Sequence, residues 1–314
     1  MPRFINPFTD WGFKKIFGQE ITKDLLIDFL NCLLVGERHI KDLEFLDKEQ
    51  LGDDAQSRGI IYDVYCTADN GEKFIVEMQN KQQSNFKERS LYYLSRAIVK
   101  QGEKGAYWQF DIKAVYGVFF LNFNLSDGEH KLRTDVVLSD KETHIQFTDK
   151  LRFIYISLPE FKKAEEECES DFERWIYVLK YMEKFERFPF KAKQSVFQKL
   201  EQIVDIASLS QEERLRYDES IKVFRDNLAV RTFAMEEGRA EGRAEGRAEG
   251  RAEGRAEGRA EGRAEGRAEG RAEGVNQRNA QIVCEMKKKG FDINTICDVT
   301  QLSADEVNSI LNVD

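Results

Sequence analysis

The sequence predicts an α/β protein, in which a mixed β-sheet core is flanked by helices and followed by a helical extension. Two observations carry this prediction. Up to residue 160, apolar residues recur with helix-like or strand-like spacing in the order helix, strands, helix, strands. From residue 161 to about 230 the spacing is helical throughout, so these helices follow the sheet rather than alternate with its strands. We therefore expect a core over residues 1–160 and a helical extension over 161–237.

The core elements follow from local patterns and from breaker residues. Gly18 is expected to interrupt the first helix, with Thr22 capping its second half, and Ser84 is an expected cap for the helix of the middle segment. The run 114–123 is almost continuously apolar and predicts a buried strand, and Pro159 ends the last strand. The elements expected in order are helix 8–35, a strand or loop at 42–46, strands 60–67 and 73–79, helix 84–104, and strands 114–123, 131–138 and 151–158.

Nine tandem Gly-Arg-Ala-Glu units run from Gly238 to Glu273. In an α-helix each unit advances about 40° beyond a full turn, like charges meet at i,i+4, and opposite charges never do. The nine glycines cost on the order of 9 kcal/mol relative to alanine. Two interpretations of residues 238–274 remain open: a long helix that self-associates, which the helical patterns on both sides favour, or a flexible spacer.

Residues 275–314 predict a small helical tail. We expect a helix over 276–289, a stop at Gly290, and two short helices over 293–299 and 303–311. The pair of short helices resembles a helix-turn-helix. The segment carries 4 basic and 6 acidic side chains, however, which suits a protein contact or an oligomerisation cap better than DNA.

Composition excludes several classes of protein. The formal net charge of -9 means that any nucleic-acid contact must come from a local basic patch. The chain has no secretory-type apolar start and no run of about 18 apolar residues, so no membrane span is expected. Its five cysteines are scattered without a CxxC pair, which fits a reduced, cytoplasmic protein. The three histidines are isolated and do not favour a zinc site.

The strands 60–67 and 73–79 carry the most informative polar residues: Asp63, Glu77 and Gln79. A three-residue loop between the strands would pair Asp63 with Glu77 on one face. A two-residue loop would slip the register by one residue and send the two acids to opposite faces. The spacing alone is equally consistent with solvated acids on an exposed hairpin, so a metal site requires the longer, bulged turn.

In the metal-site interpretation, Asp63 and Glu77 hold a hard divalent cation together with a backbone carbonyl, such as that of Met78. Magnesium is the first candidate, with manganese or calcium as alternatives. Such a cation lowers the pKa of bound water and polarises a phosphoryl oxygen. Gln79 is neutral and cannot be a strong base, but its amide could orient the attacking water or a phosphate oxygen.

Several segments, in order, resemble the PD-(D/E)XK nuclease superfamily and, in detail, the recombination-promoting nucleases (Rpn), a family also described as transposases. The resemblance spans roughly residues 4–180. A glycine-rich repeat with a short helical tail is familiar in that family too. The matching segments are Thr9–Gly18, Leu30–Leu34, Asp63-Val64, Val76–Gln79, Glu88–Tyr93 and Leu158–Phe161.

This resemblance implies a restriction-endonuclease-like core and metal-dependent DNA cleavage, with Asp63 and Glu77 as metal ligands. The superfamily's signature lysine is replaced by Gln79, so we expect metal-bound hydroxide or bulk water to act as the base. The superfamily often adds an acid from the first helix, and the candidates here are Asp10, Glu20 and Asp24.

The helix over residues 84–104 is the expected DNA-facing element. Arg89, Tyr93 and Arg96 share one helical face, where the arginines would contact phosphates. The alternative is a solvated basic face with Tyr93 half buried. Lys14 and Lys15 are weaker candidates for phosphate contact, because solvation of their helix explains them equally well.

The sequence therefore predicts a cytoplasmic, divalent-metal-dependent DNA endonuclease associated with DNA recombination. Its expected partners are DNA and a second copy of the chain, joined through the repeat and tail, and no membrane. One alternative is a transposase-like recombination protein that adds strand transfer to the same chemistry. The other is a catalytically degenerate module that binds DNA or protein.

Overall fold

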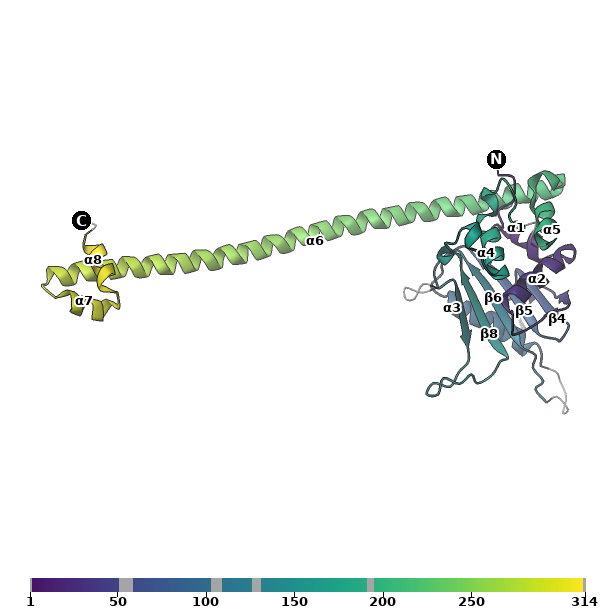
Figure 1. Ribbon diagram of the computed structural model, residues 1–314, viewed down its shortest axis with the longest axis horizontal. Coiled ribbons are helices and arrows are strands. Elements are labelled where there is room, and N and C mark those ends of the chain that lie inside the picture. Colours follow the sequence, from purple (N-terminus) through teal and green to yellow (C-terminus); the bar gives the residue numbers. More distant parts are fainter. Residues whose placement is uncertain (1, 51–58, 103–108, 126–130, 191–194, 313–314) are drawn as a thin grey trace. The chain divides into compact units, whose positions relative to one another are not determined.

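The computed structural model describes residues 2–50, 59–102, 109–125, 131–190 and 195–312. Within that part, the chain divides into two compact units, residues 1–229 and residues 230–314. The first unit contains the β-sheet, and the second contains the repeat and the tail (Figure 1). The candidate site lies in the first unit.

A six-stranded mixed sheet forms the centre of the first unit. Its neighbouring strands are, in order, β1 (Leu43–Phe45), β4 (Val64–Ala68), β5 (Lys73–Gln79), β6 (Val115–Leu121), β8 (Leu151–Ser157) and β7 (Arg133–Val137). The pairs β5–β6 and β6–β8 are parallel, and the other pairs are antiparallel. Every residue of β6 is buried, because helices cover both faces of the sheet, as its apolar sequence predicts. A separate two-stranded sheet joins β2 (Glu49–Gln50) to β3 (Ile60–Ile61).

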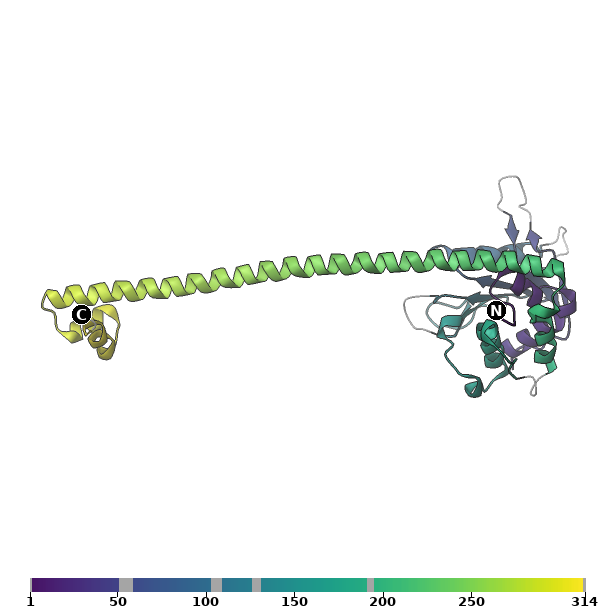
Figure 2. The ribbon, with the colours of Figure 1, turned by 90° about the horizontal axis from the view of Figure 1, so that it is seen from above.

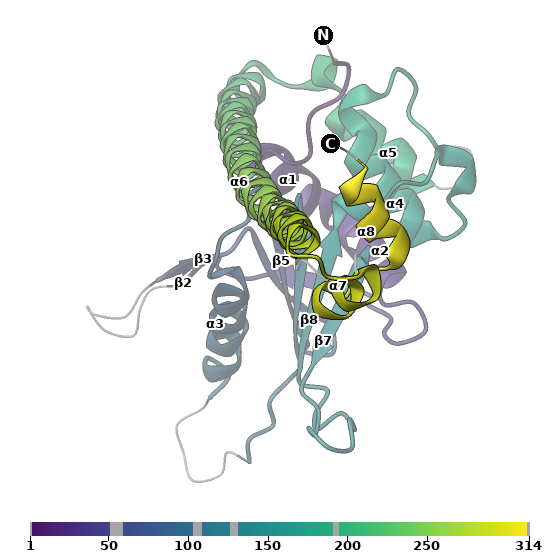
Figure 3. The same ribbon diagram turned by 90° about the vertical axis from the view of Figure 1, so that its left-hand side faces the viewer.

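Helices cover the two faces of the sheet unequally (Figure 3). One face carries α1 (Asp10–Phe17), α2 (Lys23–Leu33), α4 (Asp171–Tyr181) and α5 (Ser195–Val204). The other face carries α3 (Phe86–Val99). Alternate strand residues divide accordingly, so Phe74 and Val76 pack with the larger group and Ile75 packs with α3. This arrangement is the helix-flanked mixed sheet expected from the sequence, and it fits a restriction-endonuclease-like fold.

Short 3-10 helices join several of these elements. They are η1 (Glu20–Thr22), η2 (Leu158–Glu160), η3 (Glu165–Glu167), η4 (Met182–Lys184) and η5 (Ile206–Ser208). Pro159 lies in η2, directly after β8, and so marks the end of the strand as expected.

The start of the chain is fastened to the first turns of α6 (Gln211–Lys288), which run beside α1 (Figure 2). The backbone amide of Asn6 donates to the Tyr217 hydroxyl at 3.0 Å, and that of Trp11 donates to the Ser220 hydroxyl at 3.2 Å. Lys15 of α1 forms an ion pair with Glu213. These contacts hold α1 in place from outside the sheet.

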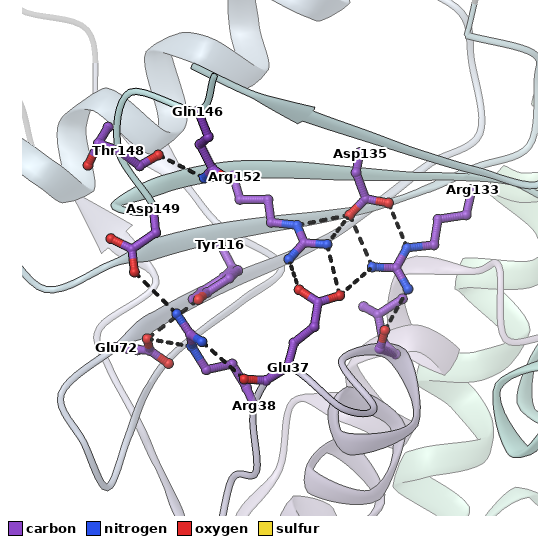
Figure 4. A network of polar contacts seen from close by, with 11 residues as sticks. Glu37, Arg38, Glu72, Tyr116, Arg133, Asp135, Gln146, Thr148, Asp149 and Arg152 are labelled. Carbon is purple, nitrogen blue, oxygen red and sulfur yellow. Dashed lines mark hydrogen bonds and ion pairs between the residues drawn. The ribbon is translucent and has the colours of Figure 1, made fainter. Parts of the chain in front are cut away.

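An ion-pair network ties the end of α2 to the edge of the sheet (Figure 4). The Arg152 guanidinium donates to Asp135 at 2.6 Å and also pairs with Glu37. Arg133 donates to Asp135 at 2.7 Å and to the carbonyl oxygen of Leu33, in α2, at 2.6 Å. Because bidentate arginine–carboxylate pairs fix geometry as well as charge, the network fastens strands β7 and β8 to α2.

The expected interruption of the first helix occurs, and Thr22 occupies the N-cap position of α2 without the expected side-chain bond. Gly18 ends α1, and α2 begins five residues later at Lys23. Thr22 makes no capping bond to α2. Its hydroxyl donates instead to the carbonyl oxygen of Gln19 at 3.1 Å, within the 3-10 turn η1, which the sequence pattern did not reveal.

The prediction of Ser84 as a helix cap was wrong. Helix α3 begins at Phe86, and Asn85 occupies its N-cap position without a capping side-chain bond. The helix ends at Val99, earlier than the expected end at residue 104, which lies outside the described residues.

The repeat is helical. Helix α6 runs without a break from Gln211 to Lys288 and includes residues 238–274. The long-helix interpretation is therefore confirmed for the conformation of the repeat, and its self-association stays a prediction. No side chain or backbone atom lies within 4 Å of where a Cβ would stand on the glycines of the repeat, so they face open space. None of the helices formed by the described residues is both long and apolar enough to cross a membrane.

The tail folds as the sequence predicts. Gly290, at φ +87°, follows the end of α6, and α7 (Ile293–Thr300) and α8 (Ala304–Leu311) come next. The three helix segments meet at a small core of Val283, Ile296 and Val307. Ser303 caps α8 through the backbone amide of Glu306, and the Glu306 carboxylate accepts from Ser303 in return.

Candidate active site

The turn between β4 and β5 has the three-residue form that the metal-site hypothesis requires. The Ala68 amide donates to the Glu72 carbonyl at 2.7 Å, and the Gly71 amide donates to the Ala68 carbonyl at 2.8 Å. Gly71 has φ +83°, in the left-handed region that glycine adopts without strain. Val64 is consequently paired with Val76, and the next positions outward are Asp63 and Glu77.

Two hydrogen bonds from backbone amides hold the Asp63 and Glu77 carboxylates across the hairpin. The Asp63 backbone amide donates to Glu77 Oε1 at 3.0 Å. The backbone amide of Met78 donates to Asp63 Oδ2, also at 3.0 Å. Each acid therefore accepts from the backbone of the opposite strand, which holds the two carboxylates together at the end of the hairpin. Glu77 shares its face of β5 with Ile75, the face that α3 covers.

Burial makes this pair of acids electrostatically costly. Glu77 is only 3 % exposed, and the Asp63 side chain is 22 % exposed. Burial, followed by the charge of Asp63, raises the pKa of Glu77 to about 8. Burial also raises the pKa of Asp63, against the lowering effect of its hydrogen bond from Met78. Because two neighbouring carboxylates are poorly tolerated in a dry environment, either a proton or a cation stabilises them.

Positive side chains approach the pair from separate elements. The Lys14 ammonium, on α1, lies 3.9 Å from Asp63 Oδ1. Lys14 and Lys48 both act to lower the pKa of Asp63, and Arg89, on α3, acts to lower that of Glu77. Burial and the charge of Lys14 in turn lower the pKa of Lys48. Three cations from different parts of the chain thus act on the two carboxylates, a setting suited to an anionic ligand.

The donor set fits a hard divalent cation. One oxygen of each carboxylate accepts from a backbone amide. The second oxygens face other groups: Asp63 Oδ1 faces Lys14, and Glu77 Oε2 lies 3.4 Å from the Gln79 amide nitrogen. Two carboxylate oxygens with an amide beside them are the kind of ligand that magnesium and manganese accept. The described part of the chain contains no cluster of three or more His, Cys, Asp or Glu residues suited to a metal.

No acid from the first helices joins the pair. Asp10 Oδ1 lies 2.6 Å from the Lys14 ammonium, so its carboxylate is already engaged. Asp24 pairs with Lys199 at 2.5 Å, and Glu20 is exposed in the 3-10 turn. Of these three candidates, only Asp10 acts on the site, by raising the pKa of Asp63 through its negative charge.

Comparison with known proteins identifies the family of this chain. The chain matches the family model described as PD-(D/E)XK nuclease family transposase over residues 7–232. The chain belongs to this family. The match includes the sheet, the acid pair and the first turns of α6. No match was found among the curated proteins or among the solved structures. Membership in the PD-(D/E)XK nuclease family indicates a nuclease-like function, and such nucleases typically use divalent metals.

In this PD-(D/E)XK protein, the three residues expected to face DNA lie at the edge of the α3 core. The Arg89 guanidinium lies 5.8 Å from the Phe86 ring centre and 5.7 Å from that of Tyr93. Tyr93 is half-buried, and its ring packs edge-on against Tyr62 at 5.5 Å. Arg96 is also half-buried, and its positive charge acts to lower the pKa of the Tyr62 hydroxyl. Tyr93 therefore packs α3 against Tyr62, whereas the charge of Arg89 acts on Glu77 of the acid pair.

Two residues near the candidate site, Lys48 and Asn80, were not predicted from the sequence. Lys48 lies in a short polar segment without periodicity, and it reaches the site because its carbonyl accepts from the Tyr62 amide at 3.0 Å. Asn80 follows β5, and its side-chain amide donates to the Phe8 carbonyl at 2.7 Å, which fastens α1 beside the acid pair. Both contacts join segments distant in sequence, so no local pattern marks them.

Proposed function

We propose that this PD-(D/E)XK family member is a divalent-metal-dependent DNA endonuclease that hydrolyses phosphodiester bonds. Asp63 and Glu77 hold the cation, and Gln79 positions a water or a phosphate oxygen. The observation that carries this proposal is the acid pair itself, which is buried, cross-bonded through the backbone and surrounded by cations. A purely structural hairpin gains nothing from placing two carboxylates together in a dry environment.

The chemistry divides among the chain's own groups. Hydrogen bonds from backbone amides orient the carboxylates of Asp63 and Glu77. Each bond uses one carboxylate oxygen, so the second oxygen of each acid is directed away from that amide. A bound magnesium or manganese ion supplies Lewis-acid polarisation and a water of lowered pKa. The Gln79 amide, 3.4 Å from Glu77 Oε2, donates to the oxygen atom that it positions. Arg89 offsets the negative charge of the DNA backbone, so binding is expected to weaken with salt.

The wider setting of the activity follows from the other parts of the chain. DNA is the substrate, and the setting is DNA recombination, in keeping with the family's description as transposases. Helix α6 and the tail join a second copy of the chain, since like charges at i,i+4 leave an isolated repeat helix poorly stabilised. All five cysteines are free, which supports action in the reducing cytoplasm.

Plasmid cleavage tests the proposal. Full-length protein is incubated with supercoiled plasmid and either Mg²⁺, Mn²⁺ or EDTA, beside Asp63→Ala. The matched control is Asp111→Asn, which removes an acid that is 76 % exposed and forms an ion pair with nearby Lys113. Metal-dependent nicking by the wild type and by the control, but not by Asp63→Ala, supports an endonuclease. Undiminished nicking by Asp63→Ala excludes the proposed site.

A transposase-like strand transfer is the second candidate, because the family description names transposases. It uses the same two acids but joins a donor end to target DNA instead of releasing it to water. Supplying a labelled donor duplex with the plasmid separates the two activities. Donor label covalently attached to the plasmid supports strand transfer, and absence of both nicking and joining supports a module that only binds DNA or protein.

A further inference from the structure

The side chain of Lys14 lies closer to the acid pair than any local sequence pattern indicates. Its ammonium is 2.6 Å from Asp10 Oδ1, one helical turn earlier, and 3.9 Å from Asp63 Oδ1. The Lys14 side chain retains 32 % exposure, so it is neither buried nor freely solvated. Lys14 is thus held between the exposed Asp10 and the largely buried Asp63. Its ammonium is therefore close to any ligand that Asp63 binds.

The N-terminus of α1 is fixed at several points, which in turn fixes Lys14. The Thr9 hydroxyl accepts from the Gly12 amide at 3.0 Å and so caps the helix. A Cβ on Gly12 would lie only 2.3 Å from the Asn6 carbonyl oxygen, so the close approach there requires glycine. The bond from Asn80 to the carbonyl preceding Thr9 anchors the same turn at the end of β5.

The charge balance of the proposed reaction leaves a place for such a cation. The two carboxylates and the scissile phosphodiester bring three negative charges, and the transition state spreads further charge over the phosphoryl oxygens. A single divalent cation balances only two of these charges. Arg89 acts on Glu77, Lys48 acts on Asp63, and Lys14 acts on both acids, with its ammonium 3.9 Å from Asp63 Oδ1.

We propose that Lys14 is a catalytic residue of this site, whose ammonium donates a hydrogen bond to a non-bridging oxygen of the scissile phosphate. Asp10 is then a positioning residue that orients Lys14, rather than a third metal ligand. Lys14 keeps its proton throughout and forms no covalent bond. This inference rests on the proposed endonuclease activity. The competing explanation is that Lys14 serves only as a counter-ion that stabilises Asp63 in the fold.

Three variants of the full-length protein test the inference: Lys14→Met, Lys14→Arg and Asp10→Asn. Lys23→Met is the matched control, because its ion pair with Asp42 has almost the same exposure, 29 % and 66 %, as the 32 % and 68 % of the Lys14–Asp10 pair. Cleavage of a short DNA duplex is measured as kcat and KM, and Mn²⁺ binding is measured separately by electron paramagnetic resonance.

We expect Lys14→Met to lower kcat about 100-fold with little change in KM, as loss of one transition-state donor does. Lys14→Arg keeps the charge and retains activity within about 10-fold of the wild type. Asp10→Asn loses about 10-fold, the usual effect of removing an orienting partner. Lys23→Met stays within about 3-fold of the wild type, since exposed ion pairs contribute little. Mn²⁺ binds Lys14→Met at least as tightly as wild type, because a like charge is gone.

Several results overturn the inference. The inference is wrong if Lys14→Met keeps the kcat of the wild type. It is also wrong if Lys14→Met and Lys23→Met lose the same amount of activity. Weaker Mn²⁺ binding by Lys14→Met supports the counter-ion explanation instead. If the wild type cleaves and Asp63→Ala does not, but Lys14→Met does, only the role of Lys14 falls. If the folded wild type cleaves with no metal, the proposed function falls, and the role of Lys14 falls with it.

Discussion

Binding of Mn²⁺ to the acid pair is expected to weaken steeply as the pH falls below 8. Burial and the neighbouring Asp63 raise the pKa of Glu77 to about 8. Below that pH a proton and the cation compete for the same carboxylate. For one competing proton, the apparent affinity falls about 50-fold between pH 8 and pH 6, which corresponds to about 2.3 kcal/mol.

The same raised pKa determines how stability depends on pH. The unfolded chain releases the Glu77 proton near its ordinary pKa of 4.5, whereas the folded chain holds it until about pH 8. The folded state therefore binds more protons across this window, and the metal-free fold loses stability as the pH rises through it. Mn²⁺ removes that loss by replacing the proton, so it should raise the Tm more at pH 8 than at pH 6.

Titration of full-length protein with Mn²⁺ at pH 6, 7 and 8 measures both effects, by electron paramagnetic resonance for binding and by differential scanning fluorimetry for Tm. Glu77→Gln should bind weakly at every pH and should lose the pH dependence. Glu212→Gln removes a glutamate that is 75 % exposed, in an i,i+4 pair with Arg216, and serves as the control. An affinity for Mn²⁺ that is the same at pH 6 and pH 8 in the wild type would refute the reasoning.

Three further predictions concern stability. Gly12→Ala should lower the free energy of unfolding, measured in urea, by about 2 kcal/mol, because its Cβ would lie 2.3 Å from a backbone oxygen. Gly238→Ala, in open space, should raise it by up to about 1 kcal/mol. Equal effects of the two substitutions would contradict this reasoning. Arg152→Met should cost about 2 kcal/mol, because Asp135 and Glu37 in Figure 4 would keep Arg133 as a partner but lose Arg152; the exposed Lys113→Met should cost less than about 0.5 kcal/mol. A peptide of residues 238–274 should gain helical circular dichroism as salt screens its i,i+4 repulsions. A version with Arg and Glu exchanged in every second unit should lose helicity with salt, and the same response in both peptides would contradict this.

The sheet was predictable because its signals are local. The apolar pattern predicted β5, and an almost continuous apolar run predicted β6. The single strand expected over 60–67 was wrong, because Ile60–Ile61 forms β3 of the two-stranded sheet, β4 begins at Val64, and Asp63 lies between them. The relative register of β4 and β5 was not predictable, since Asn70-Gly71 suits both a two-residue and a three-residue loop. Whether the two acids share a face depended on that single residue of register, and only the structure decides it.

The rest of the site could not be predicted because it depends on contacts between distant segments. Lys48 is held near Asp63 by the bond from the Tyr62 amide to its carbonyl, and the side-chain amide of Asn80 fastens the start of α1 through the Phe8 carbonyl. The roles of Asp10 and Lys14 likewise depend on where α1 packs, which no spacing rule determines. The expected caps depended on similar details. Thr22 occupies the N-cap position of α2, but its hydroxyl bonds within the preceding 3-10 turn, and α3 starts one residue too late for Ser84 to be its N-cap.

The repeat was ambiguous for an energetic reason. Its glycines and its like-charge pairs lower the helical stability of the segment taken alone, so propensity and pattern gave opposite indications. The helical segments at both ends remove the cost of starting a helix, because a helix that is already formed propagates more easily than a new one nucleates. The structure extends one helix, α6, through all nine units.

The bond from the Asp63 amide to Glu77 and the bond from the Met78 amide to Asp63 make strand alignment and ligand binding a single property of this hairpin. A shift of one residue in the register of the two strands would break both bonds and separate the two acids at the same time. No intermediate register would therefore keep a partly formed site. Substitutions far away in the turn should then switch the site on or off as a whole instead of tuning its strength.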